Sequence, residues 1–330
     1  MSTIAASAEP PADPAAPRTR RNWWILGVKL LLVALVLLGA RHAFVQAWQK
    51  LQVHSLSIDP SWLVAAGALY LLGLAPSGWF WHRLMEALGQ RPAIGDSLAA
   101  YFIGHLGKYV PGKALVVVLR AGLVRGPQVD VKVAAACVAL ETLTMMAVGT
   151  VIALAVLSSV VSGAYAGFMP LAAVAAGVGL LAFLPALRHA LKLVERKRPV
   201  WLENLAWRDL GWKVLVPGWL WIAFGWALQG LSLWATLRAL GATTLGPVSD
   251  LPLCTAAVAI SVVAGFLSFF PAGLVAREAV LLLVLDAAGI DPSLALAVAV
   301  LQRLVSLVSE LGISAILYLG LVLRKGRPLR

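Results

Sequence analysis

The sequence is poor in charged residues. Only 13% of its 330 residues are charged, against about 25% in an average soluble protein. A soluble domain could not bury the 61% of residues that are hydrophobic, because a single core stops growing at about 250–300 residues. The composition therefore excludes a cytosolic enzyme, a secreted domain and a disordered protein, and it indicates a protein whose solvent is the lipid bilayer.

Cysteine and histidine are also scarce, with two and five residues. Cys137 and Cys254 lie inside apolar stretches without metal-ligand spacing, and two thiols make no disulfide framework. The histidines are scattered and form no HExxH pattern, which is the spacing that two histidines on one helix face need to bind zinc. We therefore expect no metal and no cofactor.

Motifs of catalysis are missing as well. The sequence contains no P-loop and no GxSxG nucleophile elbow, so neither ATP hydrolysis nor that kind of serine chemistry is indicated. His105, with Lys108 and Tyr109 nearby, forms the only cluster suited to acid–base chemistry, although such a histidine is more often simply hydrogen-bonded in a helix. These absences favour a protein that is not an enzyme and leave a catalytic role open.

Long apolar runs, in contrast, are abundant. A spanning helix needs about 20 apolar residues, and the runs here are continuous, whereas the strands of a membrane β-barrel alternate. We expect an all-α, polytopic integral membrane helical bundle with about eight spans in a single domain over 23–323. The expected spans are 23–40, 61–81, 131–158, 166–187, 214–238, 250–270, 272–289 and 293–323.

The net charge of +12 is better explained by a membrane surface than by nucleic acid, since basic residues collect on the cytoplasmic side of membrane proteins. Placing the N-terminus inside puts most of the 27 basic residues in cytoplasmic segments. We therefore expect two cytoplasmic tails, a disordered one at 1–22 and a basic one at 324–330. We also expect an uncleaved first helix and an interfacial helix at 198–213.

One segment, 97–124, does not fit a simple span, because it begins and ends beside basic clusters that belong on the cytoplasmic side. Two half-length apolar pieces flank the sequence GKYVPGK at 107–113. Proline disfavours a continuous helix there, and a broken backbone at membrane depth is tolerated only where it faces protein or a water-filled cavity. The pattern predicts a re-entrant hairpin of two short helices that marks a site.

A second break is indicated within 265–290, at the sequence FPAG (270–273). Gly104 and Pro111 in the first segment loosely match Gly265 and Pro271 in the second. Paired interruptions in two halves of a chain are the best sequence indication of a transporter's binding site. The stretch 272–289 could also re-enter the membrane, but the charge bias favours a span because re-entry would place the basic C-terminus outside.

Ionisable residues inside the apolar runs each cost about 2.5–3.5 kcal/mol on insertion scales. They include Glu141, the pair Arg277-Glu278, Asp286, and Arg303 with Glu310 on one face of a helix. Two interpretations stay open. Acids and arginines of different helices could neutralise each other inside the bundle, or the arginines could hold a lipid phosphate while the carboxylates hold a coupling cation or proton.

Lysines 108 and 113 and Arg120 form a further basic set around the first break. They could form an anion site beside a helix N-terminus, or the lysines could reach back to the headgroups of the cytoplasmic leaflet.

The two broken segments resemble motifs of the lysylphosphatidylglycerol synthase transmembrane region family, also called flippase-like or YbhN-like membrane proteins. GHLGKYVPGK (104–113), followed by Arg120, is similar to the first motif, and PAGLVAREAVLLLVLDAAGI (271–290) to the second. Arg303 corresponds to a later arginine in the last long helix. The resemblance covers residues 24–323 and implies the membrane half of the synthases, which is associated with moving lipid between leaflets. We expect the soluble aminoacyl-transferase domain of the full-length synthases to be absent.

Together, these observations predict binding and translocation of a phospholipid or lipid-linked polar headgroup across the inner (plasma) membrane. A membrane-embedded transferase or accessory subunit of envelope lipid or glycan synthesis is the alternative, and a structural scaffold the third. The expected partners are membrane lipids carrying an anionic headgroup, with a second copy of the chain or an envelope-biosynthesis enzyme also possible. The candidate substrate-binding residues are Lys108, Tyr109, Pro111, Gly112, Lys113, Arg120, Glu141, Pro271, Gly273, Arg277, Glu278, Arg303 and Glu310.

Overall fold

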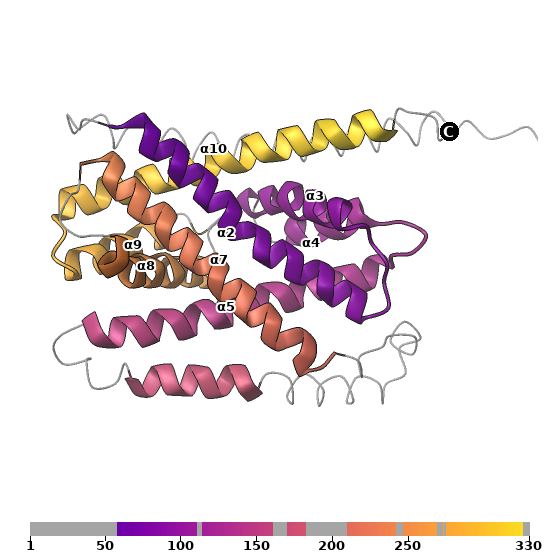
Figure 1. Cartoon of the computed structure of the whole chain (residues 1–330), viewed down its shortest axis with the longest axis horizontal. Coiled ribbons are helices and arrows are strands. Elements are labelled where there is room, and N and C mark those ends of the chain that lie inside the picture. Colours follow the sequence, from indigo (N-terminus) through magenta and orange to yellow (C-terminus); the bar gives the residue numbers. More distant parts are fainter. Residues whose placement is uncertain are drawn as a thin grey trace, which may run out of the picture.

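The computed structural model describes residues 58–110, 114–160, 170–182, 210–241, 247–268, 273 and 275–325. In this part of the chain the structure consists of helices and contains no β-strand (Figure 1), which confirms the all-α prediction. The long helices are α2 (Pro60–Ala87), α5 (Val131–Val160), α7 (Trp212–Ala239), α8 (Pro247–Leu267) and α10 (Pro292–Lys325).

Each of these five helices contains a segment long and apolar enough to cross a bilayer. They correspond to the spans expected at 61–81, 131–158, 214–238, 250–270 and 293–323, so these five predictions are confirmed as long apolar helices. The expected span 23–40 lies outside the described residues, as do nearly all of the interfacial helix and the tail at 1–22. The expected span 166–187 is described only as a short apolar helix, Pro170–Ala182.

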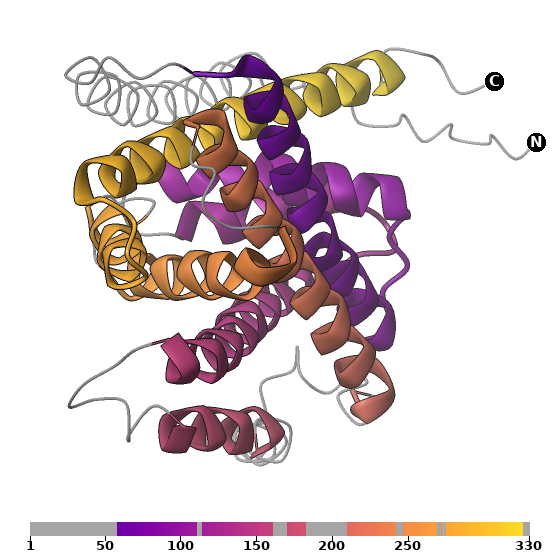
Figure 2. The same ribbon diagram turned by 60° about the vertical axis from the view of Figure 1, so that its left-hand side comes forward.

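Helices α2 and α7 form the most extensive contact in the described structure and cross the molecule side by side (Figure 2). A Cβ atom on Gly73 of α2 would lie 2.9 Å from the carbonyl oxygen of Gly225, and one on Gly225 would lie 2.6 Å from that of Gly73. Glycine at both positions lets the two backbones approach closely, which is how small residues drive helix association in membranes.

Helix α2 begins with Pro60 at its first turn, where the missing N–H costs nothing. Asp59 is the N-cap and accepts hydrogen bonds from the Ser61 hydroxyl at 2.7 Å and the Ser61 N–H at 2.9 Å. These two bonds lower the pKa of the Asp59 carboxyl from its ordinary value, because they stabilise the charged form. The Asp59 N–H in turn donates to the Ala239 carbonyl at 2.9 Å, so the start of α2 lies beside the end of α7.

The segment 97–124 is broken, as expected, into short helices. Helix α3 (Ile94–His105) continues into a 3-10 turn, η1 (Leu106–Tyr109), and α4 (Ala114–Val124) packs back against α3. The two ends of this pair meet: the N–H of Arg91 donates to the Gln128 carbonyl at 3.2 Å, and the N–H of Asp130 donates to the Gln90 side chain at 2.7 Å. The chain therefore leaves the α3–α4 pair at the place where it entered.

The stretch expected as a span at 272–289 differs from the prediction. It contains α9 (Ala276–Ala287), a helix of 12 residues, which is about 18 Å long against the roughly 30 Å of the hydrocarbon core. Gly273 and Val275, at φ of 69° and 70°, interrupt the chain before α9. Because α9 also packs on α8, α8 and α9 form a second pair in which a short helix folds back beside its predecessor.

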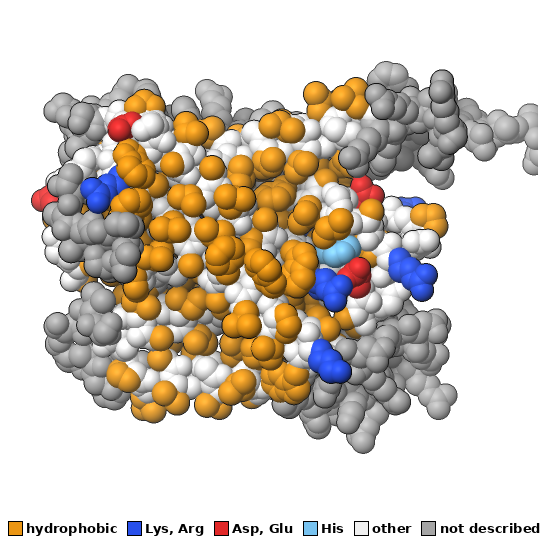
Figure 3. All heavy atoms as spheres, viewed as in Figure 1, with side chains coloured by type: hydrophobic (Ala, Val, Ile, Leu, Met, Phe, Trp, Pro, Cys, Tyr) orange, Lys and Arg blue, Asp and Glu red, His pale blue; other side chains and the backbone are white. Residues whose placement is uncertain are grey.

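The face of the molecule seen in Figure 3 carries hydrophobic side chains across its middle, while the charged side chains lie toward its two ends. Large hydrophobic side chains such as Leu72, Leu220 and Phe224 are exposed in the described structure. An exposed apolar band between polar ends is what a bilayer requires of the surface that faces lipid.

Candidate functional site

A cavity of about 460 Å³ lies between the two broken helix pairs and α2, α5 and α7. Small-molecule sites in proteins have volumes of roughly 300–1,000 Å³. Most of the wall is apolar, with residues such as Leu74, Val117 and Phe266. Four side chains that carry formal charge at neutral pH also line it, and these are Lys108, Arg120, Glu141 and Arg277.

Arg120 of α4 and Glu141 of α5 form a buried ion pair on this wall. Arg120 Nη1 donates to Glu141 Oε2 at 2.9 Å, and the two side chains are only 3% and 1% exposed. The guanidinium carbon lies 3.8 Å from the ring centroid of Tyr101, and the Tyr101 hydroxyl donates to Glu141 at 3.3 Å. Glu141, an acidic residue inside an apolar run, is thus neutralised by an arginine of a neighbouring helix.

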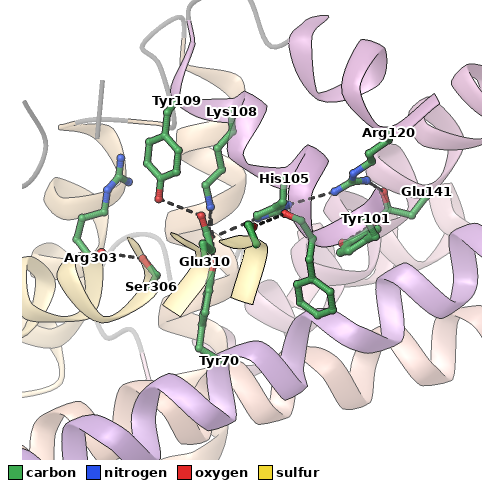
Figure 4. Close-up of polar contacts among 12 residues, drawn as sticks. Tyr70, Tyr101, His105, Lys108, Tyr109, Arg120, Glu141, Arg303, Ser306 and Glu310 are labelled. Atoms are coloured by element: carbon green, nitrogen blue, oxygen red, sulfur yellow. Dashed lines mark hydrogen bonds and ion pairs between the residues drawn. The ribbon is translucent and has the colours of Figure 1, made fainter. Parts of the chain in front are cut away.

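Glu310 of α10 is the centre of a second buried cluster. Its carboxylate accepts from the Tyr109 hydroxyl at 3.0 Å, from the Tyr70 hydroxyl and from the Lys108 ammonium group. The donors come from α2 and η1, so this carboxylate joins three elements (Figure 4). Burying a charged carboxylate costs free energy, and three hydrogen-bond donors, one of them a cation, offset that cost here.

His105 lies between the two clusters, as Figure 4 shows. Its Nδ1 atom is 3.1 Å from Nη2 of Arg120, and its Nε2 atom is 3.6 Å from Oε1 of Glu310. The imidazole also stacks on Tyr101, with ring centroids 6.0 Å apart. One histidine therefore connects the Arg120–Glu141 pair with the Glu310 cluster.

A third ion pair lies beside the Glu310 cluster. Arg303 Nη1 of α10 is 3.5 Å from Oε1 of Glu278 in α9, and the Arg303 guanidinium carbon lies 6.0 Å from the Tyr109 ring centroid. Arg303 and Glu310, which share one face of α10, thus both have partners of opposite charge on other elements. Neither Glu278 nor Arg303 lines the cavity, so both lie one layer behind the residues that a ligand would touch.

Arg277, the second residue of α9, differs from the other cations. It lines the cavity but forms no ion pair with any carboxylate of the described residues. Among the described residues of the cavity wall and of the three ion pairs, there are four cations, Lys108, Arg120, Arg277 and Arg303, and three carboxylates, those of Glu141, Glu278 and Glu310. Arg277 therefore accounts for an excess of one positive charge.

Arg120 and Arg277 are each packed against a glycine of the preceding helix. A Cβ atom on Gly104 of α3 would collide with the stem of Arg120, and one on Gly265 of α8 would collide with the stem of Arg277. In each broken pair, a glycine in the last turn or two of the first helix gives room to an arginine of the second helix. The loose match between the two segments in the sequence thus has a geometric counterpart at the cavity.

The structure brings together most of the residues predicted for the site. Gly273 also lines the cavity. Pro111, Gly112, Lys113 and Pro271 lie outside the described residues. Asp286, which stood out in the sequence as an intramembrane charge, is exposed near the end of α9 and lies apart from these clusters.

The sequence contained no indication of Tyr70 and Tyr101, and for His105 it favoured a structural role over acid–base chemistry. A tyrosine inside an apolar run scarcely changes its hydropathy, so the run itself contains no signal for its hydroxyl group. A polar tip on an apolar ring is nevertheless the feature that lets tyrosine reach a buried carboxylate. Within the described residues, no group of three or more histidine, cysteine, aspartate or glutamate side chains could hold a metal ion.

Residues 24–312 of the chain match the model of a family described as the lysylphosphatidylglycerol synthase TM region. The chain belongs to this family. The match covers both broken segments and every residue of the three ion-pair clusters. A comparison with curated proteins found no match. Membership in the lysylphosphatidylglycerol synthase TM region family, together with five long apolar helices, makes this a multi-pass membrane protein.

Proposed function

We propose that the protein binds the anionic headgroup of a phospholipid or lipid-linked molecule in the cavity and translocates it across the inner membrane. The observation that supports this proposal is Arg277, a cation that lines an apolar-walled cavity without a described carboxylate partner. A cation in such surroundings is costly unless an anion compensates it. A phosphate group from the membrane would supply that compensation.

The chemistry of the guanidinium group favours phosphate as the ligand. Its planar fork of N–H donors matches two phosphate oxygens at once, which the ammonium group of lysine cannot do. The apolar wall strengthens the attraction, because charges interact more strongly away from water. The acyl chains would remain in the surrounding lipid while the headgroup occupies the cavity.

Both broken helix pairs contribute to this mechanism. Discontinuous helices that meet at a shared site are the usual construction of transporters with two related halves. Here α3–α4 supplies Arg120 and α8–α9 supplies Arg277, and each arginine is packed on a glycine of its own pair. Movement of one pair relative to the other would open the cavity to one leaflet and then to the opposite one.

The proposal includes a membrane topology in which α3–α4 is re-entrant and both chain termini are cytoplasmic, and this requires the α8–α9 pair to begin and end on the same side of the membrane. The hydrogen bonds that join Arg91 to Gln128 and Gln90 to Asp130 support it, since the two ends of the pair lie together. In a variant without Cys137 and Cys254, single cysteines placed at Arg91 and at Gln128 are expected to react with an impermeant maleimide from the cytoplasmic side.

A cysteine in place of Asp59 serves as the control for this topology. It lies at the opposite end of the 28-residue helix α2 from Arg91 and is expected to react from the opposite side. Labelling of positions 91 and 128 from different sides of the membrane would show that α3–α4 crosses the bilayer and would contradict the re-entrant arrangement.

Translocation itself can be tested in proteoliposomes that contain fluorescent phospholipids of several headgroups and an impermeant quencher added outside. We expect the protein to expose inner-leaflet dye to the quencher for an anionic phospholipid. If no phospholipid and no lipid-linked substrate moves, the alternative function, a transferase or accessory subunit of envelope synthesis, would be favoured instead.

A further inference from the structure

His105 is a partly buried titratable group, with 16% of its side chain exposed, and the proposed binding of the headgroup by Arg277 does not involve it. Its Nδ1 atom faces Nη2 of Arg120 at 3.1 Å. A guanidinium group can only donate hydrogen bonds, so Nδ1 acts as the acceptor and the imidazole is neutral. The ring proton then lies on Nε2, on the side of Glu310, whose Oε1 atom is 3.6 Å away. A second proton on this ring would have to be placed on Nδ1, against an N–H of Arg120.

Charged and titratable groups surround His105 from every element packed around it. Tyr101 of its own helix α3, Arg120 of α4 and Glu310 of α10 lie against His105. Tyr70 of α2 and Lys108 and Tyr109 of η1 bind the same Glu310 carboxylate, while Glu141 of α5 and Arg277 of α9 line the same cavity. The cations Lys108, Arg120 and Arg277 outnumber the two carboxylates by one. With the cavity empty, a proton on His105 would raise this excess to two positive charges, which disfavours it.

An anion in the cavity reverses this balance. One negative charge beside Arg277 and Arg120 cancels the excess, and a protonated His105 then gains an ion pair with Glu310 on one side. On its other side Arg120, which lines the same cavity, would donate its Nη2–H to the anion instead of to Nδ1, and this would leave Nδ1 free to hold the proton. The same anion that needs Arg277 therefore favours a proton on His105.

We propose that His105 is the binding site of a proton that the protein takes up together with the anionic headgroup. This inference rests on the proposed function and adds an energy source to it. Because coupling between two ligands is reciprocal, the proton strengthens headgroup binding as much as the headgroup strengthens proton binding. A headgroup with one negative charge plus one proton is electrically neutral, which reduces the cost of moving it through the membrane. A proton gradient would then drive lipid from one leaflet to the other.

The coupling can be measured on the full-length protein in detergent, titrated with phosphatidylglycerol between about pH 5 and pH 8, where a histidine titrates. We expect the affinity to rise as the pH falls, by up to about tenfold per pH unit for one linked proton. Binding heats in buffers of different ionisation enthalpy should reveal proton uptake. Phosphatidylcholine, whose headgroup has no net charge, should cause none.

The variant His105→Gln keeps a polar side chain but cannot be protonated, and its affinity for phosphatidylglycerol is expected to be independent of pH. His82→Gln is the matched control. His82 is also buried in the bundle, 3.0 Å from the Ser97 hydroxyl and 3.4 Å from Glu86, but it does not line the cavity. This variant should keep the pH dependence of the parent protein.

Two results would overturn the inference while leaving lipid binding intact. The first is binding of phosphatidylglycerol by the parent protein without proton uptake, a measurement that requires no variant. The second is an unchanged pH dependence in His105→Gln, which would assign the proton to another titratable group of the site, such as Glu141, Glu310 or Lys108. Failure of any anionic phospholipid to bind or to move at any pH would instead overturn the proposed function, and this inference with it.

Discussion

Replacing Arg277 by alanine is expected to abolish most of the protein-dependent translocation of an anionic phospholipid in proteoliposomes. Arg277 lines the cavity and has no described carboxylate partner, so its loss removes the unpaired positive charge at the site. A hydrogen bond to a charged group contributes about 1.5–3 kcal/mol, which corresponds to roughly a ten- to hundredfold change in binding. The rate of quenching of inner-leaflet dye measures this effect directly.

Two further variants separate the charge of Arg277 from its packing. Arg277→Gln keeps most of the stem that packs on Gly265 and should lose translocation to a similar extent, whereas Arg277→Lys should keep part of it because it retains the charge but not the fork. Arg83→Ala is the matched control, since Arg83 is half exposed and pairs with Glu86 at 2.5 Å, outside the cavity. Normal transport by Arg277→Ala in a correctly inserted protein would rule out a role for this arginine in headgroup binding.

Glu141→Ala is expected to lower the free energy of unfolding by about 3–5 kcal/mol, which is the typical cost of breaking a buried ion pair by removing one partner. Arg120 would remain buried, with its only described carboxylate partner gone. The consequence is a large fall in the thermal unfolding temperature of the detergent-solubilised protein, measured by the loss of monodispersity on heating.

The matched variant is the double substitution Arg120→Leu with Glu141→Leu, which removes both charges and leaves apolar side chains in a largely apolar wall. Replacement of a complete buried pair by apolar residues is often neutral or stabilising, so the double variant should unfold at a higher temperature than Glu141→Ala. Equal destabilisation by the single and double variants would show that the ion pair itself is not the source of the effect. Headgroup binding should be impaired in the double variant, because this variant lacks Arg120, which lines the cavity.

The two predictions depend on different properties of the site. Arg120 is held in place by Glu141, Tyr101 and His105, so its loss or the loss of its partner affects the fold. Arg277 has no such described partners, so its loss affects the ligand first. This division between a compensated and an uncompensated arginine is the basis for assigning the headgroup to Arg277.

Much of the helical architecture could be predicted from the sequence. Five apolar runs become long helices because, in lipid, a backbone must satisfy its own hydrogen bonds and the helix does so within one segment. The break near Pro111 is also a local property, since proline ends a helix through its own ring and missing donor. The length of α9 could not be read in this way. The positive φ angles of Gly273 and Val275 interrupt the chain just before the helix begins at Ala276, and this leaves it only 12 residues.

The sequence by itself indicated most of the charges that lie inside the bundle, with the exposed Asp286 as the exception, and its motifs indicated the family. Only the tertiary structure decided how these charges are paired. Arg120 meets Glu141 from the adjacent helix, while Lys108 meets Glu310 from a helix 202 residues away. Residues on separate helices come together only when the helices pack, so the spacing of two residues along the chain does not tell whether their side chains meet. For the same reason, the absence of a described carboxylate partner for Arg277 is a property of the folded molecule alone.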